Sequence, residues 1–280
     1  MKKLTIATCQ HDVCGEIKVN LYAIRNLMKR AGLQGADIIH FPETSLSGYA
    51  GVDFPLIRKK DNEQLQVALS NICELAGHLR LWVIIGSHHF EEGIKKPFNS
   101  LYVINDRGKI AHRYDKRLLT NYGDELDVNH YMPGKEPVVF NLNGIKCGLL
   151  ICHEWRYPEL YREYYKKKAK VIFQSWYDGN HSKSEYEKSG KYLGELIPGT
   201  VRGNAANNHM WISGSNTSRK ESNFPAFIIR PDGRIHNKLK RNKQGVLISR
   251  IDVEQEYYDP SRPWRDRVMK GIYTSGKMQS

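Results

Sequence analysis

In the first ninety or so residues of the chain, segments with the hydrophobic pattern of a strand alternate with segments that have the hydrophobic periodicity of a helix. Residues 4–10 alternate between apolar and polar side chains, as in a half-buried strand, and residues 36–41 and 81–88 are short apolar runs. Between them, residues 20–32 and 62–79 repeat their apolar positions at helical spacing. The β-α-β-α-β succession that results is typical of a layered α/β unit.

Turn-forming residues divide the next part of the chain into paired strands. We expect strands over residues 99–105, 109–114, 138–142 and 146–151. The second pair flanks Asn143 and Gly144, which is the strongest short hairpin signal in a sequence. Residues 118–134 lie between the two pairs and are polar and irregular, a pattern that in a compact domain favours a functional loop.

The last part of the chain alternates helices and strands and then loses its pattern. Amphipathic residues 159–168 predict a helix, whereas Pro198 predicts an irregular stretch over residues 186–198 and a helix that starts at about Gly199. Further strands are expected over residues 170–175, 209–216, 224–230, 234–237 and 245–251. Residues 253–280 form a tail with little apolar periodicity.

The composition is that of an ordinary globular enzyme. Of the 280 residues, 40% are hydrophobic and 26% are charged. There is no Pro-, Gly- or Ser-rich linker, so we expect one domain over residues 1–280, with its core in residues 3–252. There is also no apolar run of membrane-spanning length and no signal-peptide pattern, which together predict a cytoplasmic protein without a membrane partner.

Cysteine count and charge narrow the function classes further. Five cysteines, an odd number, argue against a disulfide framework. Cys9, His11 and Cys14 lack a fourth ligand at regular spacing, so we expect no metal site there. The net charge of +13 is scattered along the chain without interleaved aromatic residues, which favours a solvated basic surface over a nucleic-acid partner.

The candidate chemistry centres on a cysteine at the end of a predicted strand. Cys152 closes the apolar run of residues 148–151 and is followed by a polar turn with Pro158. A side chain there faces the carboxyl edge of a sheet, where open α/β folds bind their ligands. By itself, a lone cysteine is more commonly a small buried hydrophobic residue.

Two further charged residues follow predicted strands and change that interpretation. Glu43 follows a strand within His40-Phe41-Pro42-Glu43, and Lys116 follows the strand that ends near Tyr114. Taken singly, such residues are usually caps or surface charges. Together with Cys152, in this order, they resemble the nitrilase or carbon–nitrogen hydrolase superfamily, whose members carry a glutamate in a Pro-Glu…Gly-Tyr stretch, then a lysine, then a cysteine.

The resemblance implies a fold and a mechanism. It covers about residues 3–252 and implies an α/β fold, a four-layer α-β-β-α sandwich of two helix-covered sheets packed face to face. In the implied reaction, Glu43 accepts the proton of Cys152, whose thiolate attacks the carbon of a C–N bond. Lys116 and the backbone N–H of His153 stabilise the oxyanion, and a thioester is hydrolysed. No metal or organic cofactor is implied.

The resemblance also implies substrate-contacting residues. Many members keep a second acidic residue in the loop after the lysine, and we assign this role to Glu125, with Asp127 as the rival. The other candidate substrate-binding residues are the following aromatic and imidazole side chains: Tyr49, His153, Trp176 and Tyr177. The family commonly has Glu-Asn before an aromatic strand, where this chain has Asn207-Asn208.

The expected function is hydrolysis of a small linear amide or N-carbamoyl compound through a cysteine thioester. The alternatives are a nitrilase and a non-catalytic interaction module of the same fold. Nitrile-hydrolysing relatives typically have Trp-Glu after the cysteine, whereas His153-Glu154 followed by Arg156 is similar to the amidase-like branches. Arg156 either binds a substrate carboxylate or braces the turn in a buried ion pair.

The resemblance further implies at least a homodimer. Family members typically pair through helices near the nucleophile, and most soluble oligomers are two-fold. The predicted helix over residues 159–168 carries an apolar, aromatic face that suits such a contact. That face consists of Leu160, Tyr161, Tyr164 and Tyr165.

Overall fold

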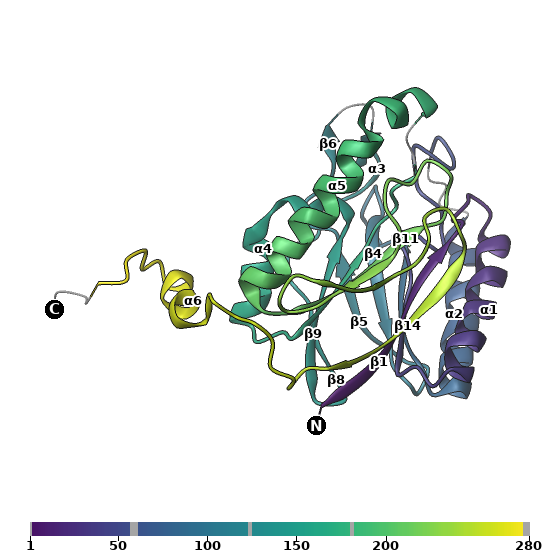
Figure 1. The fold of residues 1–280 in the computed structure, drawn as a ribbon. Coiled ribbons are helices and arrows are strands. Elements are labelled where there is room, and N and C mark those ends of the chain that lie inside the picture. Colours follow the sequence, from purple (N-terminus) through teal and green to yellow (C-terminus); the bar gives the residue numbers. More distant parts are fainter. Residues whose placement is uncertain (1, 57–60, 123–124, 180–181, 277–280) are drawn as a thin grey trace.

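The computed structural model describes residues 2–56, 61–122, 125–179 and 182–276, and of Tyr122, Glu125 and Leu126 it describes the backbone only. Figure 1 shows strands in the middle of the molecule, with α1 (Ile17–Leu33) and α2 (Asp61–Leu79) on one side and α4 (Pro158–Lys166) and α5 (Lys183–Asn208) on the other. Among the described residues, twelve strands form one hydrogen-bonded sheet that divides into two halves, and two short strands form a separate pair.

The first half-sheet has the strand order β5-β4-β3-β2-β1, and β14 pairs with β1 on its other side. The neighbouring strands β1, β2 and β3 are parallel, as expected where helices connect them. Its strands are β1 (Lys3–His11), β2 (Ile38–His40), β3 (Trp82–His89), β4 (Phe98–Ile104), β5 (Ile110–Asp115) and β14 (Gly245–Asp252).

The second half-sheet has the order β11-β10-β9-β8, with β12 and β13 attached to β11. Its strands are β8 (Val139–Leu142), β9 (Ile145–Ile151), β10 (Val171–Ser175), β11 (Trp211–Thr217), β12 (Phe227–Ile229) and β13 (Ile235–Lys238). The loop between the halves carries β6 (Asn121–Tyr122), β7 (Glu125–Leu126) and the single-turn α3 (Asp127–His130). The two halves join where β1 pairs with β11 at Gln10 and His11.

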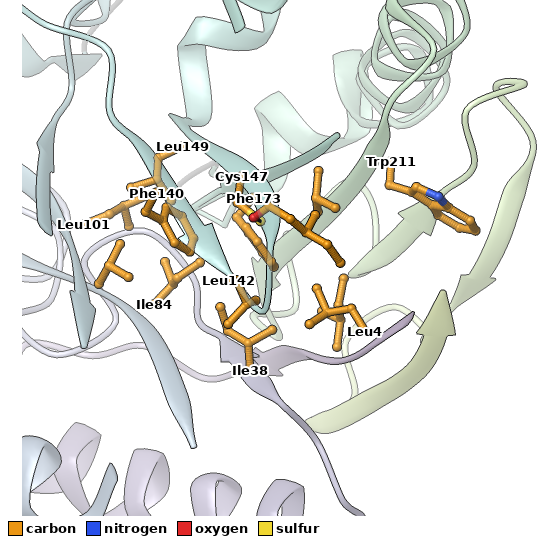
Figure 2. Packing of buried hydrophobic residues seen from close by; sticks show 14 of the residues in the cluster. Leu4, Ile38, Ile84, Leu101, Phe140, Leu142, Cys147, Leu149, Phe173 and Trp211 are labelled. Atoms are coloured by element: carbon orange, nitrogen blue, oxygen red, sulfur yellow. Dashed lines mark hydrogen bonds between the residues drawn. The ribbon is translucent and has the colours of Figure 1, made fainter. Parts of the chain in front are cut away.

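The two half-sheets pack face to face on an apolar core. Leu4, Ile38 and Ile84 of the first half pack in one cluster with Phe140 and Phe173 of the second (Figure 2). Two more clusters fill the spaces between the sheets and the helices, one under α1 and α2 and one under α4 and α5. The order of layers is therefore α-β-β-α, and the predicted four-layer sandwich is confirmed.

The structure corrects the prediction around Pro198. Helix α5 is continuous from Lys183 to Asn208 with Pro198 inside it. It begins with a capping box in which the Ser182 hydroxyl accepts the backbone N–H of Glu185. Downstream of the proline, α5 buries Val201 against the second half-sheet, so packing outweighs the backbone hydrogen bond that proline cannot make.

The aromatic face expected to form a dimer contact lies largely inside the chain. Tyr161 and Tyr164 are fully buried between α4 and the second half-sheet. The Tyr165 hydroxyl donates to Asp266 of the C-terminal helix α6 (Arg262–Met269), an element that the sequence pattern did not indicate. The homodimer remains a prediction, but these buried tyrosines do not support it.

The described residues contain neither a membrane-spanning helix nor a cluster of metal-ligating side chains. No helix among them is both long and apolar enough to cross a membrane. Nor do three His, Cys, Asp or Glu side chains within residues 2–56, 61–122, 125–179 and 182–276 gather as a metal site requires.

Candidate active site

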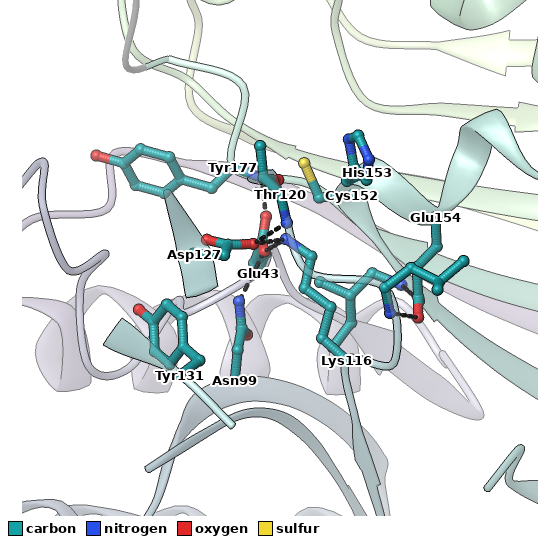
Figure 3. A network of polar contacts seen from close by, with 12 residues as sticks. Glu43, Asn99, Lys116, Thr120, Asp127, Tyr131, Cys152, His153, Glu154 and Tyr177 are labelled. Atoms are coloured by element: carbon teal, nitrogen blue, oxygen red, sulfur yellow. Dashed lines mark hydrogen bonds and ion pairs between the residues drawn. The ribbon is translucent and has the colours of Figure 1, made fainter. Parts of the chain in front are cut away.

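Three strand ends from both half-sheets meet at one edge of the molecule. Glu43 follows β2, Lys116 follows β5 and Cys152 follows β9. Figure 3 shows their side chains together with Asp127, which opens α3 in the loop between the half-sheets. The three residues singled out in the sequence are therefore brought into one site, although the chain separates them widely.

Glu43 is fully buried and both of its carboxylate oxygens are hydrogen-bonded. Oε1 accepts from Lys116 Nζ at 2.9 Å and from Asn99 Nδ2 at 2.8 Å. Oε2 accepts the backbone N–H of Tyr177 at 3.0 Å, so a strand end of the second half-sheet holds a carboxylate of the first. Asn99 was not a candidate in the sequence, because its position within β4 carries no local signal of chemistry.

Lys116 is fully buried and lies between two carboxylates. Its ammonium donates to Glu43 Oε1 at 2.9 Å and to Asp127 Oδ2 at 2.6 Å. Asp127 Oδ2 also accepts the backbone N–H of Thr120 at 3.0 Å. Asp127, which was the rival candidate, thus takes the place beside the lysine. The preferred Glu125 belongs to β7, and its side chain lies outside the described residues.

The charges of this group shift each other's pKa values. Burial raises the pKa of Glu43 above its ordinary value, against the opposing field of Lys116. Burial alone would lower the pKa of Lys116, but Asp127 and Glu43 outweigh it and hold that pKa well above its ordinary value. Burial also acts to raise the pKa of Asp127, yet the lysine holds it below its ordinary value. The lysine is therefore a permanent cation at neutral pH.

Cys152 occupies a strained turn. It ends the run of β9 and opens a 3₁₀ helix over Cys152–Arg156, with a φ of 40° in the left-handed region that non-glycine residues seldom adopt. Its thiol is free and half-buried. Burial, and after it the negative charge of Glu43, raises the pKa of the Cys152 thiol well above its ordinary value, while Lys116 acts in the opposite sense. At rest the thiol is protonated.

Glu154 braces the turn that carries the cysteine, a role that the sequence did not reveal. Its buried carboxylate accepts the backbone N–H groups of Ile151 at 2.7 Å and Arg117 at 2.8 Å. It also accepts the Tyr114 hydroxyl at 2.7 Å. Because Arg117 follows Lys116 directly, one side chain ties the lysine segment of the first half-sheet to the cysteine turn of the second.

A glycine in β3 makes room for the Glu43 turn. A Cβ on Gly86 would lie 2.4 Å from the backbone nitrogen of Thr44 and 2.6 Å from the carbonyl oxygen of Pro42. Thr44 itself has a φ of 48°, which is strained for a β-branched residue. The turn that carries Glu43 is therefore pressed against the sheet, and only a residue without a side chain fits at position 86.

The tyrosines expected to bind substrate serve the polar network. The Tyr49 hydroxyl donates to Asp127 Oδ1 at 2.5 Å, and the Tyr177 backbone holds Glu43. Trp176 differs from the expectation, because its ring packs against Phe224 and Phe227 under α5. A side chain at that point of the strand faces the helix layer, so Trp176 reaches the site only through its carbonyl, which accepts the Glu43 backbone N–H.

The residues that follow the cysteine are partly open to solvent. His153 is half-buried and its ring is hydrogen-bonded with the Tyr157 hydroxyl at 3.2 Å. Burial lowers the pKa of His153 to about 4, so its ring is neutral at physiological pH. Arg156 is exposed and lies over the Trp155 ring at 4.5 Å. An exposed guanidinium does not form the buried ion pair that was one of its two expected roles.

One departure from the expected motif has a visible consequence. At Asn207, where the family commonly has a glutamate, the backbone carbonyl accepts Nε of Arg265 from α6 at 2.8 Å. Asn208 donates to the carbonyl of Asn204 within α5 at 2.9 Å. At this point the hydrogen bonds therefore go to main-chain carbonyls and not to a glutamate carboxylate.

A known protein family matches most of the chain. The family described as carbon-nitrogen hydrolase matches residues 5–258. The chain belongs to the carbon–nitrogen hydrolase family. The resemblance drawn from Glu43, Lys116 and Cys152 is thereby confirmed at the level of the family.

Curated relatives within the carbon–nitrogen hydrolases differ in length. Glutamine-dependent NAD(+) synthetase of Acinetobacter baylyi is 28% identical over 98% of this chain, but this chain spans only 49% of that protein. The 2-oxoglutaramate amidase of Bacillus subtilis is 24% identical over 97% of this chain and 100% of its own length.

Solved structures show the same carbon–nitrogen hydrolase fold. An amidase from Nesterenkonia sp. superposes with a TM-score of 0.76 and 19% identity, over 96% of this chain and 95% of its own. In a mutant of that amidase, the acetamide moiety of fluoroacetamide is bound covalently to the active-site cysteine. At such identity the likeness establishes the fold alone.

Proposed function

We propose that this carbon–nitrogen hydrolase is a thiol amidase that cleaves the non-peptide C–N bond of a small linear amide or N-carbamoyl compound. The observation that carries the proposal is the buried Lys116, which lies between Glu43 and Asp127 and acts electrostatically on the Cys152 thiol. A buried cation next to a nucleophile suits a reaction in which negative charge develops at the attacked carbonyl.

In the first step Glu43 acts as the general base. The Cys152 thiol is protonated at rest because burial raises its pKa, so attack requires an acceptor for its proton. Burial also raises the pKa of Glu43, which makes its carboxylate a stronger base than an exposed one. The proton passes to Glu43 as the sulfur bonds to the carbonyl carbon.

Lys116 and the backbone N–H of His153 then stabilise the tetrahedral oxyanion. Glu43 returns the proton to the leaving nitrogen, which departs as ammonia or an amine and leaves a thioester on Cys152. Glu43 next activates a water molecule that hydrolyses the thioester and regenerates the thiol. Asp127 keeps Lys116 charged and in place throughout the cycle, because its carboxylate accepts from the ammonium at 2.6 Å.

Amides are favoured over nitriles as substrates by two observations. Cys152 is followed by His153-Glu154 and not by the Trp-Glu typical of nitrile-hydrolysing relatives. The full-length relative from Bacillus subtilis is named an amidase. Both that name and the word "glutamine-dependent" in the synthetase name point to amides at the end of a short acid chain, and we propose this substrate class first.

An ammonia-release assay with matched substrate pairs tests the proposal. Purified protein is incubated with short ω-amide acids, the corresponding ω-cyano acids and N-carbamoyl amino acids, and the Cys152→Ala variant serves as the blank. Faster release from the amide of each pair supports the amidase, whereas faster release from the cyano acid assigns a nitrilase. If none of the three substrate classes releases ammonia, and iodoacetamide alkylates Cys152 no faster than the other four thiols, the protein is a non-catalytic module.

A further inference from the structure

Asp53 is a buried carboxylate outside the group that contacts the reacting atoms. It belongs to the loop between β2 and α2, and its side chain is only 1% exposed. Oδ2 accepts the backbone N–H of Tyr49 at 2.7 Å, and Oδ1 accepts the Tyr177 hydroxyl at 2.9 Å. The Arg219 guanidinium forms an ion pair with Oδ1. One carboxylate thus joins three loops that follow three different strands.

Both tyrosines lead from Asp53 into the candidate active site. The Tyr49 hydroxyl donates to Asp127, the partner of Lys116, and the Tyr177 backbone N–H donates to Glu43. The two tyrosine rings are stacked, with centroids 4.8 Å apart and planes at 27°. A shift of either ring therefore displaces the other, and through them both carboxylates that hold Lys116.

Arg219 closes this arrangement from the far side. Its guanidinium lies over the Tyr177 ring at 5.3 Å, and its Nε donates to the carbonyl of Val13 at 3.2 Å. Val13 follows β1, so the arginine also fixes the end of the central strand. The charge of Arg219 offsets that of Asp53, which otherwise would be a buried and unpaired carboxylate.

We propose that Asp53 is a positioning residue, which aligns Glu43 and Asp127 on Lys116 by holding Tyr49 and Tyr177. The inference deepens the proposed function and rests on it. Both tyrosine hydroxyls already donate to carboxylates of the protein, so neither has a proton left to donate to a substrate. Sub-ångström alignment matters here, because a misplacement of about 1 Å can lower a rate by about 100-fold.

The test is Asp53→Asn, which keeps the shape but turns an NH₂ group toward at least one of the three donors. We expect kcat to fall by about 10- to 100-fold with KM within about threefold of wild type. The rate of Cys152 alkylation by iodoacetamide should fall as well, because removal of the thiol proton depends on the position of Glu43. Arg219→Lys, which keeps the charge, should lose less than Arg219→Met.

Asp232→Asn is the matched control. Asp232 is also a nearly buried carboxylate paired with an arginine, Arg230 at 2.5 Å, but it lies in the turn between β12 and β13. This variant should lose stability while kcat and Cys152 alkylation stay at the wild-type level. The proposal is overturned if Asp53→Asn behaves in the same way, or if it raises KM alone, which would make Asp53 a substrate contact.

The alkylation readout separates this inference from the proposed function. If wild type releases no ammonia from any amide, but Asp53→Asn still slows Cys152 alkylation by about tenfold, the amidase assignment fails and the positioning role stands. If ammonia is released and both proteins are alkylated at equal rates, the amidase assignment stands and Asp53 has no positioning role.

Discussion

The two half-sheets contribute unlike parts to the site. The first supplies the charged side chains, Glu43 and Lys116, which are fully buried and hydrogen-bonded to one another. The second supplies a half-buried thiol on a strained turn and a backbone N–H from Tyr177. The difference separates two tasks: the charged half fixes an electrostatic field before any substrate arrives, and the other half presents a group that is free to form a bond.

This division has a consequence for stability. Buried charges depend on each other, so removing one leaves its partners unpaired. A thiol without a charged role in the resting fold carries no such coupling. Mutations in the charged half should therefore affect both stability and catalysis, whereas mutation of the thiol should affect catalysis alone.

The largest effect on activity is expected from Cys152→Ala. The covalent intermediate cannot form, so turnover with the cognate amide should be lost, while the melting temperature stays near that of wild type. Assays of ammonia release and thermal unfolding on the same preparation provide the measurement. Activity above the trace level in this variant would refute covalent catalysis by Cys152.

Lys116→Met sharpens the comparison, because it should lower both the catalytic rate and the free energy of unfolding. Loss of one oxyanion donor costs catalysis about 3 kcal/mol. Two buried carboxylates, Glu43 and Asp127, then face each other without a cation, and the free energy of unfolding should drop by about 3–5 kcal/mol. Steady-state kinetics measures the loss of catalysis, and denaturant unfolding measures the loss of stability. A stable variant that differs only in KM would instead make Lys116 a docking residue.

Glu154→Gln tests the link between the halves. Every partner of the Glu154 carboxylate is a hydrogen-bond donor. The NH₂ group of glutamine would therefore leave at least one buried donor unpaired, at a cost of about 1–3 kcal/mol in unfolding free energy. The kcat should fall by roughly 10- to 100-fold because Cys152 moves relative to Lys116. Glu163→Gln is the control, since Glu163 pairs with Arg117 at 2.8 Å from a more exposed position. Equal kcat values for the two variants would contradict the link.

Gly86→Ala should displace Glu43, the proposed general base in the first half-sheet. The added Cβ collides with the Thr44 and Pro42 backbone, which we expect to cost about 1–3 kcal/mol of stability and to lower kcat. Gly203→Ala is the matched control, because a Cβ on this exposed helical glycine meets nothing within 4 Å. That control should gain about 0.5–1 kcal/mol in unfolding free energy. Unchanged kcat in Gly86→Ala would show that the Glu43 turn adapts.

The smallest effect is expected from His40, an uncharged side chain that links the two half-sheets by hydrogen bonds. His40 of β2 is hydrogen-bonded with Ser213 and Ser175 of the second half-sheet, each at 2.9 Å, and burial lowers its pKa to about 3. Below a pH of about 6.5 the unfolded chain binds a proton that the folded chain excludes, so stability is lost as pH falls. His40→Gln should remove about 1.4 kcal/mol per pH unit from that slope between pH 5.5 and 4. Equal slopes in urea unfolding would count against a neutral His40.

The sequence pattern located the strand ends well because hydrophobic periodicity is a local property. Glu43 and Cys152 each follow an apolar run and Lys116 follows one arm of a predicted hairpin, and the structure places all three at one edge. The direction of a side chain past a strand end is less predictable, since one residue of register turns it to the opposite face. Trp176 shows this, because its ring packs under α5.

Roles that depend on tertiary contact could not be predicted from local patterns. Glu154 reaches Arg117 and Leu118, and Asn99 reaches Glu43, across 36 or more residues of sequence. Gly86 is required only because the Glu43 turn lies against β3. The continuity of α5 through Pro198 also depends on packing with distant strands. In each of these positions a long-range contact outweighs the local preference.

The pairing of β1 has a consequence for how the protein is made. β1 pairs with β14 from Lys3 to Gln10, but with β11 only at Gln10 and His11. During synthesis on the ribosome, one edge of β1 therefore stays largely unpaired until β14 has been made, near the end of the chain. We expect nascent chains that end before Gly245 to expose an unpaired strand edge, a feature that promotes association between chains and recruits chaperones.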